Sequence, residues 1–221
     1  LLGSGSRRRP LSEGGRDNMT KAATKKTLTK KQQGKKQHPE KTARSEALSP
    51  RGLVIVITGN GKGKTTSAFG QALRAAGQGL KVFIMQFMKG RDYGEYKVVR
   101  RHLPQITIRR SGLDSFVMRD NPAPVDIELA RRGFASVKKA AASGKYDMLI
   151  LDEINVAVDF KLIPVEDLID FIINKPPALD LVLTGRYAPR ALVKLADTVS
   201  EVKEIKHHYA AGIKDRAGIE Y

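Results

Sequence analysis

The sequence predicts an α/β fold in which a mainly parallel β-sheet carries helices on both faces. Short continuous apolar runs rich in β-branched residues are typical of strands buried on both sides, and residues 53–57 (Leu-Val-Ile-Val-Ile) form the first of them. Segments with apolar residues at helical spacing separate these runs. Strands and helices that alternate in this way form βαβ units, and such units build parallel sheets.

The expected elements follow one another along residues 53–202. Strands are expected at residues 53–57, 81–87, 106–109, 148–151, 179–183 and 198–202. Helices are expected at residues 68–76, at 127–141, from Pro164 onward and at 189–196. Ligands of such sheets bind beyond the carboxyl ends of the strands. Because polar segments follow four of the strands, we expect one site built from residues 58–66, 86–90, 152–153 and 184–186.

The turn after the first strand has the pattern of a phosphate-binding loop. Its residues are Gly59, Asn60, Gly61, Lys62, Gly63, Lys64, Thr65 and Thr66, and a helix follows directly. Glycines let backbone N–H groups surround phosphate oxygens, and the helix N-terminus adds a positive dipole. Lys64 offers a charge to the phosphates and Thr65 a hydroxyl to Mg²⁺. The sequence therefore predicts a P-loop NTPase-like fold that binds ATP, although Thr58 replaces the usual first glycine.

Two adjacent carboxylates are expected to complete this site. Asp152 and Glu153 follow the buried run Met-Leu-Ile-Leu, which is the form of a Walker B element. A carboxylate at that strand end can hold Mg²⁺ or Mn²⁺ directly or through water. The metal ligands are therefore expected among Thr65, Asp152 and Glu153, and which carboxylate contacts the metal is left open. Lys64, Thr65 and Glu153 are the candidate catalytic residues.

The formal net charge of +17 is unevenly distributed along the 221 residues. Residues 1–51 contain 14 Lys/Arg and 4 Asp/Glu, a net of +10, and have no repeating apolar face. We expect them to form a basic, disordered tail, and residues 52–221 to form the P-loop domain. Residues 1–6 or 1–18 are expected to be cloning-derived or upstream, with Met19 as a start. A flap ordered by ligand, a nucleic-acid arm and a targeting peptide are the alternatives for the tail.

Composition also argues against several classes of protein. The chain has no cysteine, so it can form neither a disulfide framework nor a thiolate metal site, and a cytoplasmic location is expected. No apolar run approaches the roughly 18 residues that span a bilayer, so no membrane partner is expected. The basic charge suggests nucleic acid, but more than half of the excess lies in residues 1–51, which argues against that partner.

Five motifs in this order resemble one family. They are Gly-Asn-Gly-Lys-Gly-Lys-Thr-Thr (59–66), Gln-Phe-Met-Lys-Gly (86–90), Leu-Asp-Glu (151–153), Leu-Thr-Gly-Arg (183–186) and Lys-His-His-Tyr-Ala-Ala-Gly-Ile (206–213) with the ending Gly-Ile-Glu-Tyr (218–221). Together they resemble the P-loop type of ATP:corrinoid adenosyltransferase, from about residue 53 to residue 221. The resemblance implies that reduced cobalt attacks the ribose C5′ of ATP and that triphosphate leaves. It implies ATP as co-substrate with Mg²⁺ or Mn²⁺.

The resemblance also suggests contacts outside the phosphate loop. Arg74 either reaches the nucleotide or is a solvated helix cation, and Arg186 either contacts ATP or caps a loop. Lys206 and His207 lie in a polar segment that either folds over the nucleotide or stays exposed. Phe116, with Leu113, would contact the corrinoid, although the family's Gly-Phe-x-Trp segment is absent and the chain has no tryptophan. An ordinary core phenylalanine is the alternative.

The resemblance further implies a homodimer, a corrinoid substrate from cobalamin biosynthesis or salvage, and a flavoprotein as reductant. Two other function classes stay open at this stage. A nucleic-acid-stimulated P-loop ATPase would hydrolyse ATP to ADP and phosphate, faster with DNA or RNA at low salt. A nucleotide-gated interaction module would bind ATP without turnover.

Overall fold

The computed structural model describes residues 51–221, in which strands and helices alternate as the sequence predicts. The strands are β1 (Val54–Thr58), β2 (Val82–Phe87), β3 (Ile106–Ser111), β4 (Met148–Asp152), β5 (Asp180–Thr184) and β6 (Thr198–Glu201). All pair in parallel, in the order β3-β2-β4-β5-β1-β6. The predicted α/β fold with a parallel sheet is confirmed. The predicted basic tail lies outside the described residues, apart from Arg51, which donates a hydrogen bond to Asp197.

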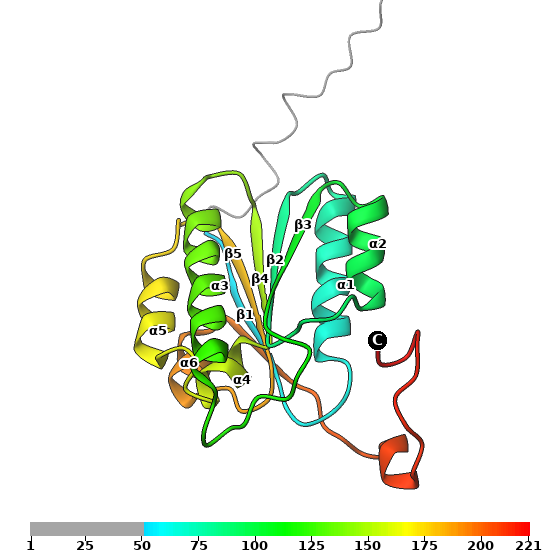
Figure 1. Cartoon of the computed structure of the whole chain (residues 1–221). Helices are drawn as coiled ribbons and strands as arrows, with labels where there is room; N and C mark the ends of the chain where they lie inside the picture. Colours follow the sequence, from blue (N-terminus) through cyan, green and yellow to red (C-terminus); the bar gives the residue numbers. More distant parts are fainter. Residues whose placement is uncertain (1–50) are drawn as a thin grey trace, which may run out of the picture. The chain divides into compact units, whose positions relative to one another are not determined.

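Helices cover both faces of this sheet (Figure 1). They are α1 (Lys64–Gly77), α2 (Gly94–His102), α3 (Pro124–Ala142), α4 (Ile154–Asp159), α5 (Val165–Ile173) and α6 (Arg190–Leu195), with a 3₁₀ turn η1 (His208–Ala211). Helices α1 and α2 pack on one face, and α3, α4, α5 and α6 lie on the other. The sequence pattern does not predict α2, which buries only Val99, or α4, which has six residues. Neither shows a full apolar stripe.

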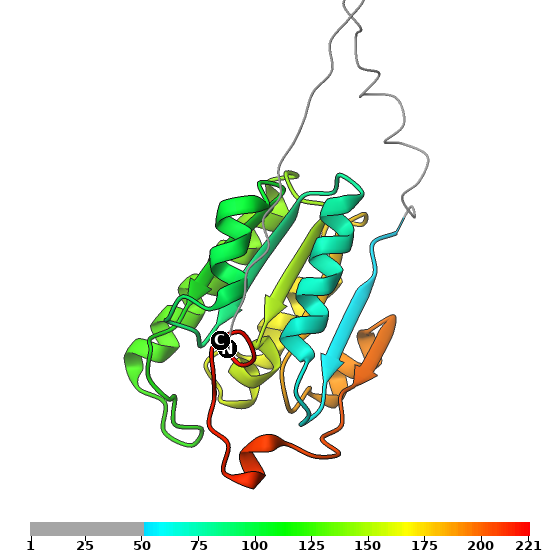
Figure 2. The ribbon, with the colours of Figure 1, turned by 90° about the vertical axis from the view of Figure 1, so that its right-hand side faces the viewer.

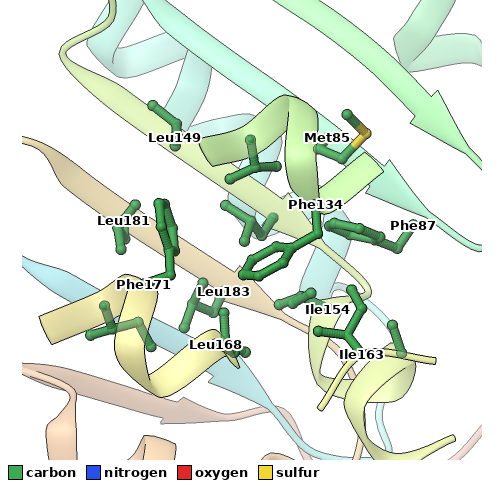
Figure 3. Packing of buried hydrophobic residues seen from close by; sticks show 14 of the residues in the cluster. Met85, Phe87, Phe134, Leu149, Ile154, Ile163, Leu168, Phe171, Leu181 and Leu183 are labelled. Atoms are coloured by element: carbon green, nitrogen blue, oxygen red, sulfur yellow. The ribbon is translucent and has the colours of Figure 1, made fainter. Parts of the chain in front are cut away.

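The central strands β1, β2, β4 and β5 are mostly apolar because both faces of the sheet are buried there. The edge strands differ, since β3 carries Arg109 and Arg110 and all of β6 is exposed. Towards α3 and α5, Phe134 and Phe171 meet edge to face with ring centroids 5.6 Å apart, over Leu149 and Leu181 (Figure 3). Towards α1, the helix presents small side chains, of which Ala68 and Ala72 are fully buried. Small residues let the helix lie close to the sheet, and this fixes where the phosphate loop at its N-terminus sits.

Gly133 of α3 is expected to be the least replaceable helical glycine in the core. A Cβ atom there would lie 2.6 Å from Ser111 Cβ and 3.3 Å from Phe87 Cε1. Overpacking costs about 1–3 kcal/mol, more than the roughly 1 kcal/mol of helix propensity that alanine gains. Gly133→Ala should therefore lower the free energy of unfolding, as measured by urea denaturation.

Gly70 of α1 provides the matched control. It is exposed, and a Cβ atom there would meet nothing within 4 Å. Gly70→Ala should stabilise the protein by about 0.5–1 kcal/mol, since alanine loses less backbone entropy on folding. Equal effects of the two substitutions would contradict the packing described for α3.

None of the helices in residues 51–221 is both long and apolar enough to cross a bilayer. The polar segments that follow β1, β2, β4 and β5 all lie at the carboxyl edge of the sheet, since every strand runs in the same direction. That edge is where the candidate site is found.

Candidate active site

The phosphate loop (residues 59–66) presents the N-terminus of α1 to a ligand. Gly63 caps the helix with a φ of 117°, a left-handed conformation that strains any residue with a side chain. No side chain of the described residues caps this end, so its first N–H groups stay available to an anion. Lys64 lies over the loop, only 7% exposed, and its Nζ donates to the Gly61 carbonyl at 2.6 Å. Burial lowers the pKa of Lys64.

The chain that follows β6 braces this loop from outside. The Gly61 N–H donates to the Val202 carbonyl at 2.8 Å, and the Glu204 N–H donates to Asn60 Oδ1 at 3.0 Å. Gly59 has a φ of 99°, and a Cβ atom there would strike the backbone of Val202. Gly59 and Asn60, which the sequence suggests as nucleotide contacts, are thus also residues that hold the loop in shape.

Asp152, at the end of β4, is a fully buried hydrogen-bond hub. Its Oδ1 accepts from the hydroxyls of Thr65 at 2.9 Å and Thr184 at 2.7 Å. Its Oδ2 accepts from Lys89 Nζ at 2.8 Å and Gln86 Nε2 at 3.1 Å. Both oxygens are thus committed to side chains from α1, β2, β5 and the loop after β2. Asp152 links all four loops that the sequence placed at this edge.

The Lys89–Asp152 ion pair sets the protonation of both partners. Burial alone would lower the pKa of Lys89, but its attraction to Asp152 outweighs burial, so this pKa is raised. Burial likewise disfavours the charged form of Asp152, but Lys89 and the hydroxyl and amide donors outweigh it and lower its pKa. Glu95 of α2 lies 4.0 Å from Lys89, and its negative charge also favours the charged form of this lysine. Both partners are charged at neutral pH.

Glu153 is the carboxylate that faces the open space. Its φ of 63° is left-handed, and its N–H donates to Thr184 Oγ1 at 3.0 Å. Burial and the neighbouring charge of Asp152 raise its pKa. Met88 after β2 and Tyr187 after β5 also have positive φ values, of 57° and 60°. Such strained residues cluster at ligand sites, where the surrounding structure holds them.

A cavity of about 690 Å³ lies beside these residues. This volume falls within the roughly 300–1,000 Å³ typical of small-molecule sites. Its lining combines the phosphate loop, the start of α1, the loop and helix after β2, and the 206–221 segment. The lining residues are Gly61, Lys62, Gly63, Lys64, Thr65, Thr66, Phe69, Lys89, Tyr93, Gly94, Glu95, Val98, Glu153, Arg186, His207, Gly218, Ile219, Glu220 and Tyr221.

The C-terminal segment (residues 206–221) closes one side of the cavity. It runs from η1 past the N-terminal end of α1 (Figure 2). Lys62 Nζ donates to the Ile219 carbonyl at 2.7 Å and to Glu220 Oε2 at 2.8 Å. The hydrogen bond from Lys62 lowers the pKa of Glu220. A lysine of the phosphate loop thus holds the segment that ends the described chain.

The site thus combines an anion-binding loop, a carboxylate pair and a cavity of nucleotide size. Comparison with known proteins shows which family has this chain as a member. Residues 50–221 match the family described as ATP:corrinoid adenosyltransferase BtuR/CobO/CobP. The chain belongs to this family. It is 37% identical over 178 residues to the corrinoid adenosyltransferase of Escherichia coli K12, covering 80% of this chain and 89% of that protein. The corrinoid adenosyltransferase CobA of Salmonella typhimurium LT2 is 36% identical with the same coverage.

Among solved structures, the RadB recombinase is similar at 14% identity, with a TM-score of 0.46, over 71% of this chain and 77% of that one. The family match confirms the resemblance drawn from the five motifs. It identifies the protein as a corrinoid adenosyltransferase of the type that uses ATP.

Several residues that sequence analysis suggested for this adenosyltransferase lie away from the cavity. Arg74 is exposed in the last turn of α1, ten residues and about 15 Å along the helix from Lys64. Lys206 is exposed, and Asp152 lies beneath the cavity surface. Leu113 and Phe116 lie in the loop after β3, and Phe116 is fully exposed. Phe116 is therefore not a core residue in this structure.

Two parts of the cavity wall were not singled out from the sequence. Lys89 belongs to the 86–90 motif, but only the structure shows that it pairs with Asp152. Tyr93, Glu95 and Val98 come from the start of α2, a helix that the apolar pattern does not mark. Lys89 could have been predicted as a site residue, because it is a cation in a polar segment that directly follows a buried strand. The sequence carries no comparable signal for α2.

Proposed function

We propose that this protein transfers the 5′-deoxyadenosyl group of ATP to the cobalt of a reduced cob(I) corrinoid and releases inorganic triphosphate. The observation that carries the proposal is the cavity, in which the phosphate loop, Glu153 and Arg186 face one space, within a family match that spans residues 50–221. Cobalt(I) supplies the electron pair for the new Co–C5′ bond. The C5′–O bond breaks, and its electron pair leaves with the triphosphate.

The protein's own groups serve to position ATP and to receive the leaving group. No proton must be removed from the cobalt nucleophile, so the reaction needs no general base. The ammonium of Lys64 and the guanidinium of Arg186 both line the cavity and would balance the negative charge of the triphosphate. Lys62 could join them if its bonds to Ile219 and Glu220 open. The N–H groups at the start of α1 bind the phosphate oxygens.

The oxygen donors around Thr65 fit a hard divalent ion. Carboxylate and hydroxyl oxygens are the ligands that Mg²⁺ and Mn²⁺ prefer. Because both oxygens of Asp152 already accept hydrogen bonds, we assign direct contact to Glu153 and Thr65, with Asp152 orienting the Thr65 hydroxyl. A bound ion would neutralise part of the triphosphate charge.

Glu153→Gln is expected to raise the Mg²⁺ concentration that gives half-maximal rate by at least about 10-fold, since even outer-shell changes weaken metal binding by 10–100-fold. Because the pKa of Glu153 is raised, its carboxyl protonates earlier than an exposed glutamate as the pH falls. The Mg²⁺ requirement of the wild type should therefore increase towards acidic pH. Glu128→Gln, on the exposed face of α3, is the control. An unchanged Mg²⁺ requirement in Glu153→Gln would contradict the assignment.

The loop after β3 is the proposed corrinoid contact. Gly90, next to Lys89 of the cavity wall, packs so closely on the backbone of Leu113 that it has no room for a side chain. Arg91 and Asp114 add an ion pair of 2.7 Å between the two loops. This places the exposed ring of Phe116 on a loop that abuts the nucleotide cavity. An exposed aromatic ring suits the broad apolar surface of a corrinoid.

Phe116→Ala is expected to raise the KM for the corrinoid by about 10-fold, the equivalent of roughly 1.4 kcal/mol of lost apolar contact. The KM for ATP should stay unchanged, because the ring does not line the nucleotide cavity. Ile173→Ala removes another exposed apolar side chain, at the end of α5, and serves as control. A change in the KM for ATP alone would contradict this role for Phe116.

The products of the reaction test the proposed function. Purified protein, ATP, Mg²⁺ and chemically reduced cobalamin should give the absorption spectrum of adenosylcobalamin together with one inorganic triphosphate per turnover. Formation of ADP and phosphate, with stimulation by DNA or RNA, would instead support a nucleic-acid-stimulated ATPase. ATP binding without either product would support an interaction module.

The proposal includes a cytoplasmic homodimer whose corrinoid substrate is reduced by a flavoprotein. Family membership supports these points. Sedimentation at several protein concentrations tests the dimer, and replacing the chemical reductant by a reduced flavoprotein tests the electron donor.

A further inference from the structure

A second group of metal-ligand side chains lies apart from the carboxylates at the end of β4. It consists of His207, His208 and Glu220, all in the C-terminal segment. One ligand atom from each lies within 4.8 Å of the others. The two imidazole rings stack with centroids 4.5 Å apart, and Glu220 approaches them from twelve residues further along the chain. The fold of the segment around η1 brings these three side chains together.

Two of the ligand atoms are shielded and lack hydrogen bonds. Within residues 51–221, His208 Nε2 and Glu220 Oε1 are buried and have no hydrogen-bond partner. They face each other 3.3 Å apart as a histidine–glutamate pair, a contact that does not have the geometry of a hydrogen bond. Buried polar atoms without partners are uncommon, and an ion between them is one standard explanation.

The spacing of His208 Nε2 and Glu220 Oε1 matches one edge of a tetrahedral coordination sphere. Zinc bonds of about 2.0–2.1 Å to imidazole nitrogen and carboxylate oxygen place neighbouring ligand atoms about 3.4 Å apart. The 3.3 Å between His208 Nε2 and Glu220 Oε1 already has that value. The ligand atom of His207 lies within 4.8 Å of the other two, and its ring, now stacked on that of His208, must turn towards them to complete a three-ligand set. Tyr209 N–H, which now donates to His207 Nδ1 at 3.2 Å, is exposed and could bond to water instead.

We propose that His207, His208 and Glu220 bind a divalent transition-metal ion of the zinc class. Two imidazoles and one carboxylate suit Zn²⁺, whereas Mg²⁺ prefers all-oxygen ligands. The ion would therefore be distinct from the one proposed at Thr65 and Glu153. Glu220 Oε2 accepts from Lys62 at 2.8 Å, the kind of outer hydrogen bond that orients a ligating carboxylate.

A metal ion at this site would fix the position of the C-terminal segment beside the nucleotide cavity. The metal would tie residues 207 and 208 to residue 220, and residues 218–221 line the cavity. Through Glu220 and Lys62 the same ion is connected to the phosphate loop. Metal binding would therefore hold the C-terminal segment closed over one side of the cavity. This role is structural and does not depend on the reaction proposed above.

Calorimetric titration of the full chain with Zn²⁺ tests the site directly. Saturating Mg²⁺ is present and nucleotide is left out, so that the oxygen ligands at Glu153 do not compete. We expect one Zn²⁺ per chain. His208→Ala and Glu220→Gln should each weaken binding by more than the 10–100-fold typical for loss of an outer-shell partner. A double variant of the other two histidines, His38→Ala with His102→Ala, should bind as the wild type does.

Two further measurements keep the test decisive. Co²⁺ in place of Zn²⁺ should give the visible absorption of a tetrahedral site in the wild type and not in His208→Ala. Zn²⁺ should also slow amide hydrogen exchange in residues 206–221, and circular dichroism checks that each variant is folded. Absence of Zn²⁺ binding, or equal binding by wild type and His208→Ala, would overturn the proposal and leave the cluster as a histidine–glutamate pair.

Discussion

Lys64→Ala is expected to lower kcat for adenosyl transfer by about 10²–10³-fold, the usual cost of removing one preorganised group that stabilises developing charge. Lys64 is the buried cation of the phosphate loop, and it lines the cavity beside Glu153. One further unit of negative charge develops on the triphosphate as the C5′–O bond breaks. The lost interaction is thus stronger in the transition state than in bound ATP, and kcat should fall more than the affinity for ATP.

The measurement is the initial rate of adenosylcobalamin formation with saturating ATP and reduced cobalamin. Lys139→Ala, on the exposed face of α3, is the control for removal of a lysine. The thermal midpoint of Lys64→Ala should stay near that of the wild type, because the side chain donates its hydrogen bond to Gly61 of its own loop. A normal kcat in Lys64→Ala would contradict the leaving-group role.

Asp152→Asn is expected to destabilise the fold by about 3–5 kcal/mol, the cost of removing one partner of a buried ion pair. The carboxamide offers one acceptor oxygen in place of two, so its NH₂ must face either the donors Lys89 and Gln86 or the two threonine hydroxyls. Lys89 would lose its closest counter-ion and keep only the weaker attraction of Glu95, 4.0 Å away. Adenosyl transfer should also fall, because the Thr65 hydroxyl loses the charged acceptor that orients it.

A second substitution separates stability from activity. Asp152→Asn combined with Lys89→Met removes both charges and replaces the lysine stem by an apolar chain of similar length. Replacing both members of a buried pair can be nearly neutral, so urea denaturation should show recovery of most of the lost stability. The transfer rate should stay low. If Asp152→Asn alone unfolds at the same urea concentration as the wild type, the ion pair does not support the fold.

Sequence patterns predicted most of the scaffold because its signals are local. The buried strands, the phosphate loop and the helix after it follow from residue types at fixed spacing, as in residues 53–57 and 59–66. Helix α2 escaped this approach because it buries only Val99, and α4 because six residues are too few to show a period. The position of α2 after β2 nevertheless brings Glu95 to Lys89 and Val98 to the cavity wall.

The candidate site likewise contains residues that local motifs predict and residues that only long-range contacts reveal. Lys64, Thr65 and Glu153 could be named from their motifs, and all three line the cavity. Arg74 was suggested from its helix, but the rise of that helix carries it about 15 Å away from Lys64. Long-range pairs such as Lys62 with Glu220, 158 residues apart, leave no pattern in the sequence.

The phosphate loop, the parallel sheet and the order of the motifs are therefore determined by the sequence alone, since each depends on neighbouring residues. Tertiary structure decided that Asp152 is a saturated hub and that Glu153 faces the cavity, because the strand order sets which side chains meet at the end of β4. It also decided that the C-terminal segment returns to the phosphate loop and gathers two histidines and a glutamate there. Contacts between residues far apart in the chain arise only when the whole sheet has formed.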